Sequence, residues 1–143
     1  MAAGADVNEL SEGDTPIVAA CLSDKLRAGA ALMKMGADAT KPGTLGFTPL
    51  QIAAMKGHAK IVKMLLRYNV DTSEMHSDGL SPFHRACRGS EIGHTDAVFA
   101  FLDAGVPPDQ PSSTGETPMQ MAGNDNTRKL LAEALQEKRR QRR

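Results

Sequence analysis

The sequence predicts an all-α fold built from pairs of short helices that repeat along the chain. A threonine or serine stands directly before a proline at Thr15-Pro16, Thr48-Pro49, Ser81-Pro82 and Thr117-Pro118. A hydroxyl side chain caps a helix N-terminus, and proline is favoured at the first helical position. The successive pairs are 33, 33 and 36 residues apart. Two apolar stripes at helical spacing, with a turn between them, follow each pair, which is typical of a helix hairpin.

The second repeat shows this pattern most regularly. Its first helix is expected to begin after the Thr48 cap and to carry its apolar stripe on Leu50, Ala53 and Ala54. Gly57 is expected to end that helix, because glycine readily adopts the left-handed conformation of a C-terminal cap. The apolar stripe of the second helix then comprises Ile61, Val62, Leu65 and Leu66.

A period near 33 residues with two helices and a turn per unit is the signature of ankyrin repeats. The sequence resembles that family from Ala3 to about Leu135. The motifs that carry the resemblance are Gly-Phe-Thr-Pro-Leu at 46–50, Gly-His at 57–58 and 93–94, and Gly-Ala-Asp at 4–6 and 36–38. The resemblance implies a solenoid of about four helix-turn-helix repeats that are joined by β-hairpin-like finger loops.

The repeat pattern gives a domain organisation. We place an ankyrin repeat domain at residues 1–137 and a basic C-terminal tail at 138–143. Within the domain we expect a partial repeat at 1–8 and repeats near 13–39, 46–72, 79–108 and 115–137.

The N-terminal end and the third repeat depart from the regular pattern. The partial repeat lacks the helices that should precede it, and an uncapped solenoid end exposes apolar surface. Val18 and Leu22 in the first full repeat fit an end that a partner covers, or alternatively reflect drift between repeats. Three extra residues within 88–92 predict a longer turn between the helices of the third repeat, which would serve binding or be a tolerated surface loop.

Charge is distributed unevenly along the chain. The last six residues hold five of the 17 basic residues, and the rest of the chain has 12 basic and 17 acidic residues. The tail could bind an anionic surface, or it could be the solvated end of the last helix. Its basic residues are Lys138, Arg139, Arg140, Arg142 and Arg143. Without a second basic cluster or interleaved aromatic residues, nucleic-acid recognition is not expected.

The sequence contains no apolar run of membrane-spanning length and no signal-peptide pattern at its start. We therefore expect an intracellular protein, located in the cytoplasm or alternatively in the nucleus.

No residue pattern typical of catalysis is present, and no cofactor or metal is expected. His84 and Cys87 share a helix face, but zinc would need about four such ligands. The resemblance implies that His84 braces the adjacent finger by local hydrogen bonds. Cys21 and Cys87 occupy the same position two repeats apart, which is too far for a disulfide if neighbouring helices pack at about 8–10 Å.

The resemblance implies a protein that binds partners along a concave surface of finger tips and first helices. The residues that the repeat register places there are Leu45, Phe47, Met55, Lys56, Met75, Leu80 and Glu116. Phe47 and Leu80 could instead pack locally against the next finger. We expect a non-enzymatic adaptor or small structural subunit of a larger assembly. The alternatives are the ankyrin portion of a longer enzyme or receptor, or an anionic-surface binder that uses the basic tail.

Overall fold

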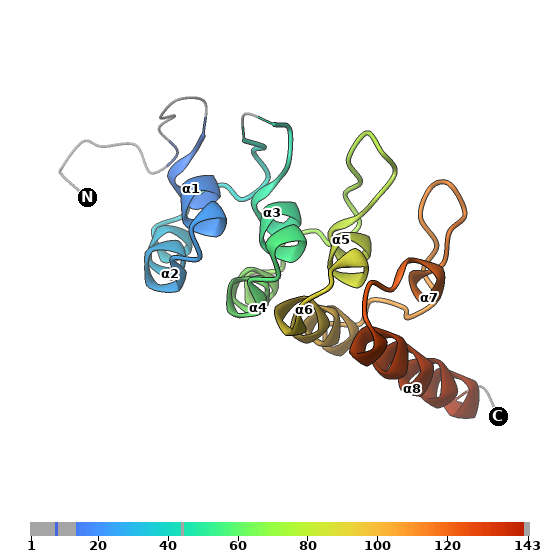
Figure 1. The fold of residues 1–143 in the computed structure, drawn as a ribbon. Coiled ribbons are helices and arrows are strands. Elements are labelled where there is room, and N and C mark those ends of the chain that lie inside the picture. The colour runs from blue at the N-terminus through green and yellow to red at the C-terminus, as the bar shows by residue number, and fades with distance from the viewer. Residues whose placement is uncertain (1–7, 9–13, 44, 142–143) are drawn as a thin grey trace.

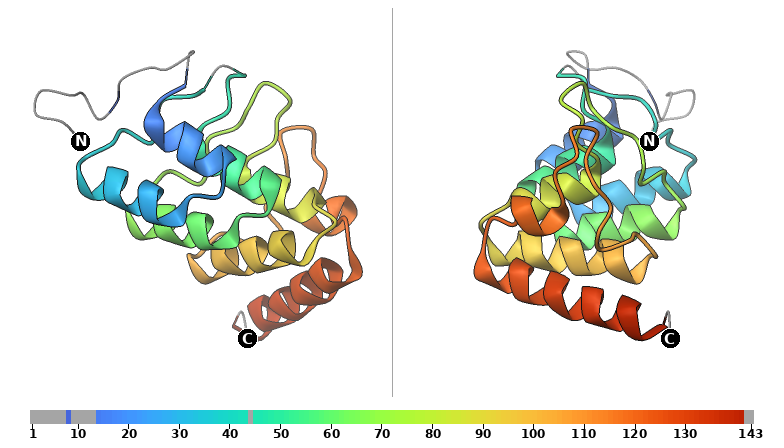
Figure 2. Two further views of the ribbon diagram at one scale, coloured as in Figure 1. Left: turned by 60° about the vertical axis from the view of Figure 1, so that its left-hand side comes forward. Right: turned by 90° about the vertical axis from the view of Figure 1, so that its right-hand side faces the viewer.

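The computed structural model describes residue 8 and residues 14–43 and 45–141. These residues form eight helices and no β-strand, so the predicted all-α class is confirmed. The helices are α1 (Pro16–Leu22), α2 (Leu26–Lys34), α3 (Pro49–Lys56), α4 (Ala59–Arg67), α5 (Pro82–Arg88), α6 (Ile92–Asp103), α7 (Pro118–Met121) and α8 (Asp125–Gln141). The odd-numbered helices form one row beside the finger loops, and the even-numbered helices form a second row (Figures 1 and 2).

All four predicted helix starts are confirmed. Thr15, Thr48, Ser81 and Thr117 each accept a hydrogen bond from a backbone N–H in the first turn of the helix that follows. Proline occupies the first helical position each time, where its missing N–H leaves no hydrogen bond unmade. These local caps fix where each first helix begins and therefore set the repeat register.

Small residues at one repeated position allow the first helices to pack closely. Cys21, Ala54 and Cys87 occupy this position in the first three repeats and are fully buried. Gly123 takes it in the fourth, and a Cβ there would lie 2.1 Å from the carbonyl oxygen of Arg88. At Gly123 the backbone of the third repeat therefore approaches too closely for any side chain.

The finger loops are hairpin-like without forming strands. Each has a backbone hydrogen bond across its neck, as from His76 N–H to the Leu80 carbonyl (3.1 Å). The buried Gln51 side chain braces one finger through the Glu74 carbonyl at 3.0 Å. His84 does the same for the next finger through the Gln110 carbonyl at 2.8 Å. These two fingers are thereby fixed relative to the helices beside them.

The three extra residues of the third repeat mainly lengthen a helix. The turn between the helices grows only from residues 57–58 in the second repeat to residues 89–91 in the third, so the prediction that all the extra residues lie in the turn is wrong. Helix α6 has 12 residues, whereas α4 has nine, and only residues 89–91 separate α5 from α6. His94 therefore lies in the first turn of α6, where its ring contacts the Met55 carbonyl oxygen at 2.8 Å. This contact ties the added turn to the end of α3.

The last repeat ends in a long helix. Helix α7 has only four residues, while α8 has 17 and extends to Gln141. The predicted helical continuation into the basic tail is therefore confirmed as far as Gln141. Arg142 and Arg143 lie outside the described residues, as does the partial repeat apart from Asn8, whose side chain accepts a hydrogen bond from Asp38 N–H at 2.8 Å. No described helix combines the length and the apolar character needed to cross a membrane.

Candidate protein-interaction surface

The fingers and the odd-numbered helices share one face of the solenoid, which we call the inner face (Figure 1). Leu22, Met55 and Arg88 occupy equivalent positions near the ends of α1, α3 and α5, at intervals of 33 residues. Each of these side chains is at least partly exposed. This position on the inner face is therefore apolar in the first two repeats and cationic in the third.

An apolar pocket of about 170 Å³ lies on this face between α1, α3 and the finger that joins the first two repeats. Its lining residues are Asp14, Val18, Leu22, Gly43, Leu45, Phe47, Ile52, Met55 and Lys56. Six of the nine partner-contact residues proposed from the sequence therefore lie together: Val18, Leu22, Leu45, Phe47, Met55 and Lys56. Among the described residues, Leu45 is the most exposed large apolar side chain, at 78%.

Val18 and Leu22 do not mark an exposed N-terminal end. Both line the pocket that faces the second repeat, and Val18 is fully buried, so the expectation that Val18 contacts a partner directly is wrong. Gly43 lies so close to Val18 that an added Cβ would be 2.8 Å from one of its methyl groups. Val18 therefore supports the pocket from below, and Leu22, 39% exposed, stands at its surface.

Phe47 packs locally against the next finger, which is the alternative that the sequence left open. Its ring stacks on His76 with centroids 4.1 Å apart, and the Arg85 guanidinium lies 4.9 Å from the ring centroid. Phe47 nevertheless remains half-buried and lines the pocket, so it both joins two fingers and contributes apolar surface.

Sequence reasoning missed Arg85. Its guanidinium pairs with Asp78 at 2.6 Å, and its side chain is only 9% exposed. Desolvation by burial opposes ionisation of Asp78, but hydrogen bonds from Leu80 N–H and Arg85 outweigh it and lower the pKa of this carboxyl group. The Arg85 Nε–H is buried without a hydrogen-bond partner among the described residues. The sequence does show an arginine directly after His84, which braces a finger. Only the fold, however, places the Arg85 guanidinium over the Phe47 ring.

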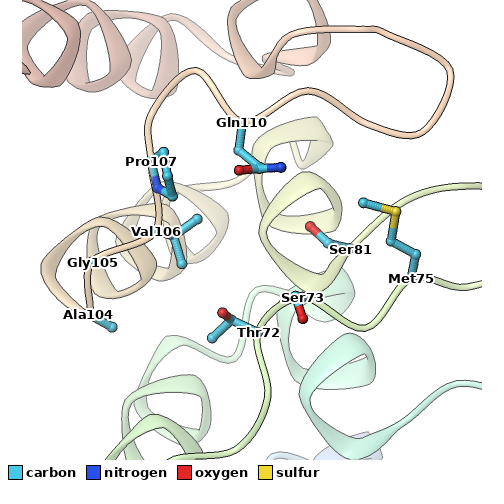
Figure 3. Close-up of a pocket in the computed structure, with 9 residues that line it drawn as sticks. All are labelled: Thr72, Ser73, Met75, Ser81, Ala104, Gly105, Val106, Pro107 and Gln110. Carbon is cyan, nitrogen blue, oxygen red and sulfur yellow. The ribbon is translucent and has the colours of Figure 1, made fainter.

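Three predicted contact residues lie away from this pocket. Leu80 is 5% exposed, so the expectation that it offers a docking surface is wrong. Met75 lines a second pocket of about 240 Å³ at the bases of two fingers, beside Ser81 and Gln110 (Figure 3). Glu116 is exposed on the last finger, where its backbone carbonyl accepts a hydrogen bond from Ser112 N–H.

The described part of the basic tail makes intramolecular ion pairs. Lys138 lies 2.7 Å from Asp109 on the last finger. Arg140 lies 3.6 Å from Glu137, one turn earlier on α8. Both ion pairs therefore occupy cationic groups that would otherwise bind an anionic surface. Arg139 is exposed.

His84 and Cys87 have structural surroundings. Ser81 N–H donates to His84 Nδ1 at 3.2 Å, so the other ring nitrogen carries the proton and donates to the Gln110 carbonyl. Desolvation by burial lowers the pKa of His84, and the Gln110 contact opposes that effect. Among the described residues no group of three or more His, Cys, Asp or Glu side chains could hold a metal ion.

Cys21 and Cys87 should be unreactive toward the thiol reagent DTNB in the folded protein. Burial raises the pKa of each thiol to about 12, and both side chains are fully buried. At about pH 8 we expect the native protein to react at less than about a tenth of the rate of urea-unfolded protein, because the thiolate is the nucleophile. Comparable rates for native and unfolded protein would contradict this burial.

The helix pairs, capped first helices and stacked fingers define a repeat protein whose described units pack mainly against their neighbours. A family profile described as ankyrin repeats (3 copies) matches residues 1–75. The chain therefore belongs to the ankyrin-repeat family, a fold that serves protein interaction. The repeats of the structure continue beyond the matched residues, through α8.

Three curated relatives share parts of this sequence. Inversin from Canis lupus familiaris is 34% identical over 76 residues, which is 53% of this chain and 7% of that protein. Ankyrin repeat and SOCS box protein 5 from Bos taurus is 33% identical over 90 residues, 62% of this chain and 27% of that protein. BCL-6 corepressor-like protein 1 from Homo sapiens is 25% identical over 104 residues, 73% of this chain and 6% of that protein.

Proposed function

We propose that this chain is a non-enzymatic interaction module, an adaptor or small structural subunit that binds a partner protein through the inner face. The observation that carries the proposal is the apolar pocket between α1 and α3, where Leu22, Leu45 and Met55 meet. Leu22 and Met55 lie on helices α1 and α3, which pack against each other, so the fold holds these two side chains in place before any partner arrives and reduces the entropy lost on binding.

The size of the pocket favours a protein side chain over a small molecule. Its volume is about 170 Å³, whereas pockets for small ligands usually enclose about 300–1,000 Å³. One large apolar side chain of a partner would fill it, in the manner of an anchor residue at the centre of an interface.

Charged groups beside the pocket favour a partner segment with acidic residues near its apolar anchor. Lys56 lines the pocket and is exposed, and Arg88 is exposed in the next repeat, at the position equivalent to Met55. Arg85 adds a third cation close to Phe47, although it already pairs with Asp78. Charge complementarity of this kind increases specificity and association rate more than affinity.

A selection from a displayed library of random peptides tests the proposal. Peptides that bind the folded chain should be rich in large apolar residues with acidic neighbours. Their affinity should fall by about tenfold or more in the double variant Leu45→Asp, Met55→Asp, because the anchor pocket acquires two charges.

The matched control is the double variant Met35→Asp, Ile92→Asp. Met35 and Ile92 are 48% and 65% exposed, and neither lines the pocket. The control should bind the selected peptides as the unmodified chain does. Peptides that lose binding equally in both variants, or in neither, would refute the inner face as the binding site.

A second candidate function is that this chain acts as the ankyrin portion of a longer enzyme or receptor. The observation that favours it is that the matched segments cover only 7%, 27% and 6% of the three relatives described above. Sequencing the encoding transcript tests this candidate: an open frame that continues into a catalytic or receptor domain would support it, and in-frame stop codons on both sides would exclude it.

A further inference from the structure

The even-numbered helices expose a regular stripe of side chains on the face opposite the fingers, which we call the outer face. On α4 this stripe consists of Lys60, Lys63 and Arg67, all of which are exposed. Positions three and four residues apart on a helix share one side, so the three cations point in similar directions. No acidic residue occurs within α4.

The corresponding stripe on α6 has the opposite charge. Repeat spacing of 36 residues places Asp96, Phe99 and Asp103 at the positions of the three α4 residues, and all three are exposed. Helix α6 contains no lysine or arginine. Charge therefore inverts between two helices that lie side by side in the outer row (Figures 1 and 2).

A hollow of about 340 Å³ separates the two stripes. Leu66 of α4 and Phe99 of α6 contribute its apolar surface, and Phe99 is 53% exposed. Lys63, Arg67 and Asp103 stand at its edges. The outer face thus combines an apolar centre with one cationic side and one anionic side, the anatomy of a small interface.

The charged groups of both stripes are available to a partner. Lys60, Lys63, Arg67, Asp96 and Asp103 form no salt bridge with any described residue. Since the Arg67 and Asp103 groups line the same hollow without pairing, the charges are not neutralised within the chain.

We propose that this surface is self-complementary and that two copies of the chain associate through it as a symmetric dimer. A two-fold axis that runs between α4 and α6, parallel to them, places α4 of each copy over α6 of the other. Because the stripes share the repeat register, Lys60 then faces Asp96 of the second copy, and Arg67 faces Asp103. The same surface patch serves both copies, as a two-fold interface requires.

Phe99 occupies the centre of this arrangement. It faces Lys63 of the second copy, whose aliphatic stem and positive charge both suit contact with an aromatic ring. The contact involves two helices per copy, whereas stable interfaces bury about 1,600 Å² in total. We therefore expect a weak dimer, with a dissociation constant on the order of 10–100 µM, formed mainly through charge pairing.

Two charge variants test the dimer directly. Lys60→Glu with Arg67→Glu makes both stripes acidic, and Asp96→Lys with Asp103→Lys makes both basic. Light scattering across a concentration series should show a monomer–dimer equilibrium for the unmodified chain and monomers for each variant alone. An equimolar mixture of the two variants should form a heterodimer, because the residues at 60 and 96 and those at 67 and 103 then face each other with opposite charges.

The control variant is Lys25→Glu with Lys41→Glu, which makes the same net charge change on exposed residues outside the even-numbered helices. It should dimerise as the unmodified chain does, and raised salt should weaken both dimers. Far-UV circular dichroism confirms that each variant folds. A monomeric unmodified chain at millimolar concentration, a dimer insensitive to the charge variants, or a mixture that remains monomeric would each overturn the proposal. None of these outcomes bears on the inner-face pocket, which lies on other helices.

Discussion

Replacing Phe101 by alanine is expected to lower the free energy of unfolding by about 3–5 kcal/mol, the largest effect of any single substitution considered for this chain. The Phe101 side chain is fully buried in α6. Its ring packs edge-on against Phe83 of α5, with centroids 6.0 Å apart. The substitution removes apolar area from the core and leaves a cavity between the two helices of the third repeat.

The measurement is urea unfolding followed by far-UV circular dichroism at a concentration where the chain is monomeric. Phe99→Ala provides the matched control, because it makes the same change two residues earlier on the same helix. Phe99 is 53% exposed, so its replacement should change the free energy of unfolding by only about 0.5 kcal/mol or less. Similar losses in the two variants would contradict the assigned faces of α6.

Replacing His84 by alanine is expected to lower the free energy of unfolding by about 2–4 kcal/mol. The His84 side chain is fully buried and satisfies two backbone groups, Ser81 N–H and the Gln110 carbonyl. Alanine would leave both groups without this partner and would free the last finger from α5. Urea unfolding measures the loss.

The variant His84→Gln separates the brace from the charge of the imidazole. Glutamine occupies the equivalent position in the second repeat, where Gln51 accepts from Thr48 N–H and donates to the Glu74 carbonyl. His84→Gln should therefore retain most of the stability at neutral pH. If His84→Gln lowered the free energy of unfolding as much as His84→Ala does, the two hydrogen bonds would not account for the contribution of His84 to stability.

The pH dependence gives an independent check on the protonation state of His84. Desolvation lowers its folded pKa below the ordinary value of 6.5, so the unfolded chain binds more protons in the window between the two values. The contribution of the neutral imidazole is fully present above pH 6.5 and is lost as pH falls toward the folded pKa. As pH falls below 6.5, the free energy of unfolding should therefore decrease more for the unmodified chain than for His84→Gln. Equal losses in the two proteins would contradict the buried neutral imidazole.

The features that could be predicted from the sequence depend on neighbouring residues in the chain. Thr48 caps a helix through the N–H of Gln51, three residues later, and Gly57 ends that helix in the left-handed conformation with φ +73°. Such contacts lie within one helical turn, so the repeat register and the all-α class follow directly from the order of residues. The family resemblance added that His84 braces a finger.

The features that could not be predicted depend on contacts between repeats. The extra residues of the third repeat lengthen α6, and the His94 ring in its first turn contacts the Met55 carbonyl, 39 positions earlier in the chain. Leu80 was placed at the surface by register but is buried in the structure.

The sequence alone determined the helix caps, the apolar stripes and the period of the repeat, because each arises within a few consecutive residues. Only the tertiary structure decided what the stacked repeats bring together. It gathered Leu22, Leu45 and Met55 around one pocket and placed the α4 cations beside the α6 carboxylates. Leu22 and Met55 are one repeat apart in the chain, as are the α4 and α6 residues, and the stacking of successive helix pairs places them side by side.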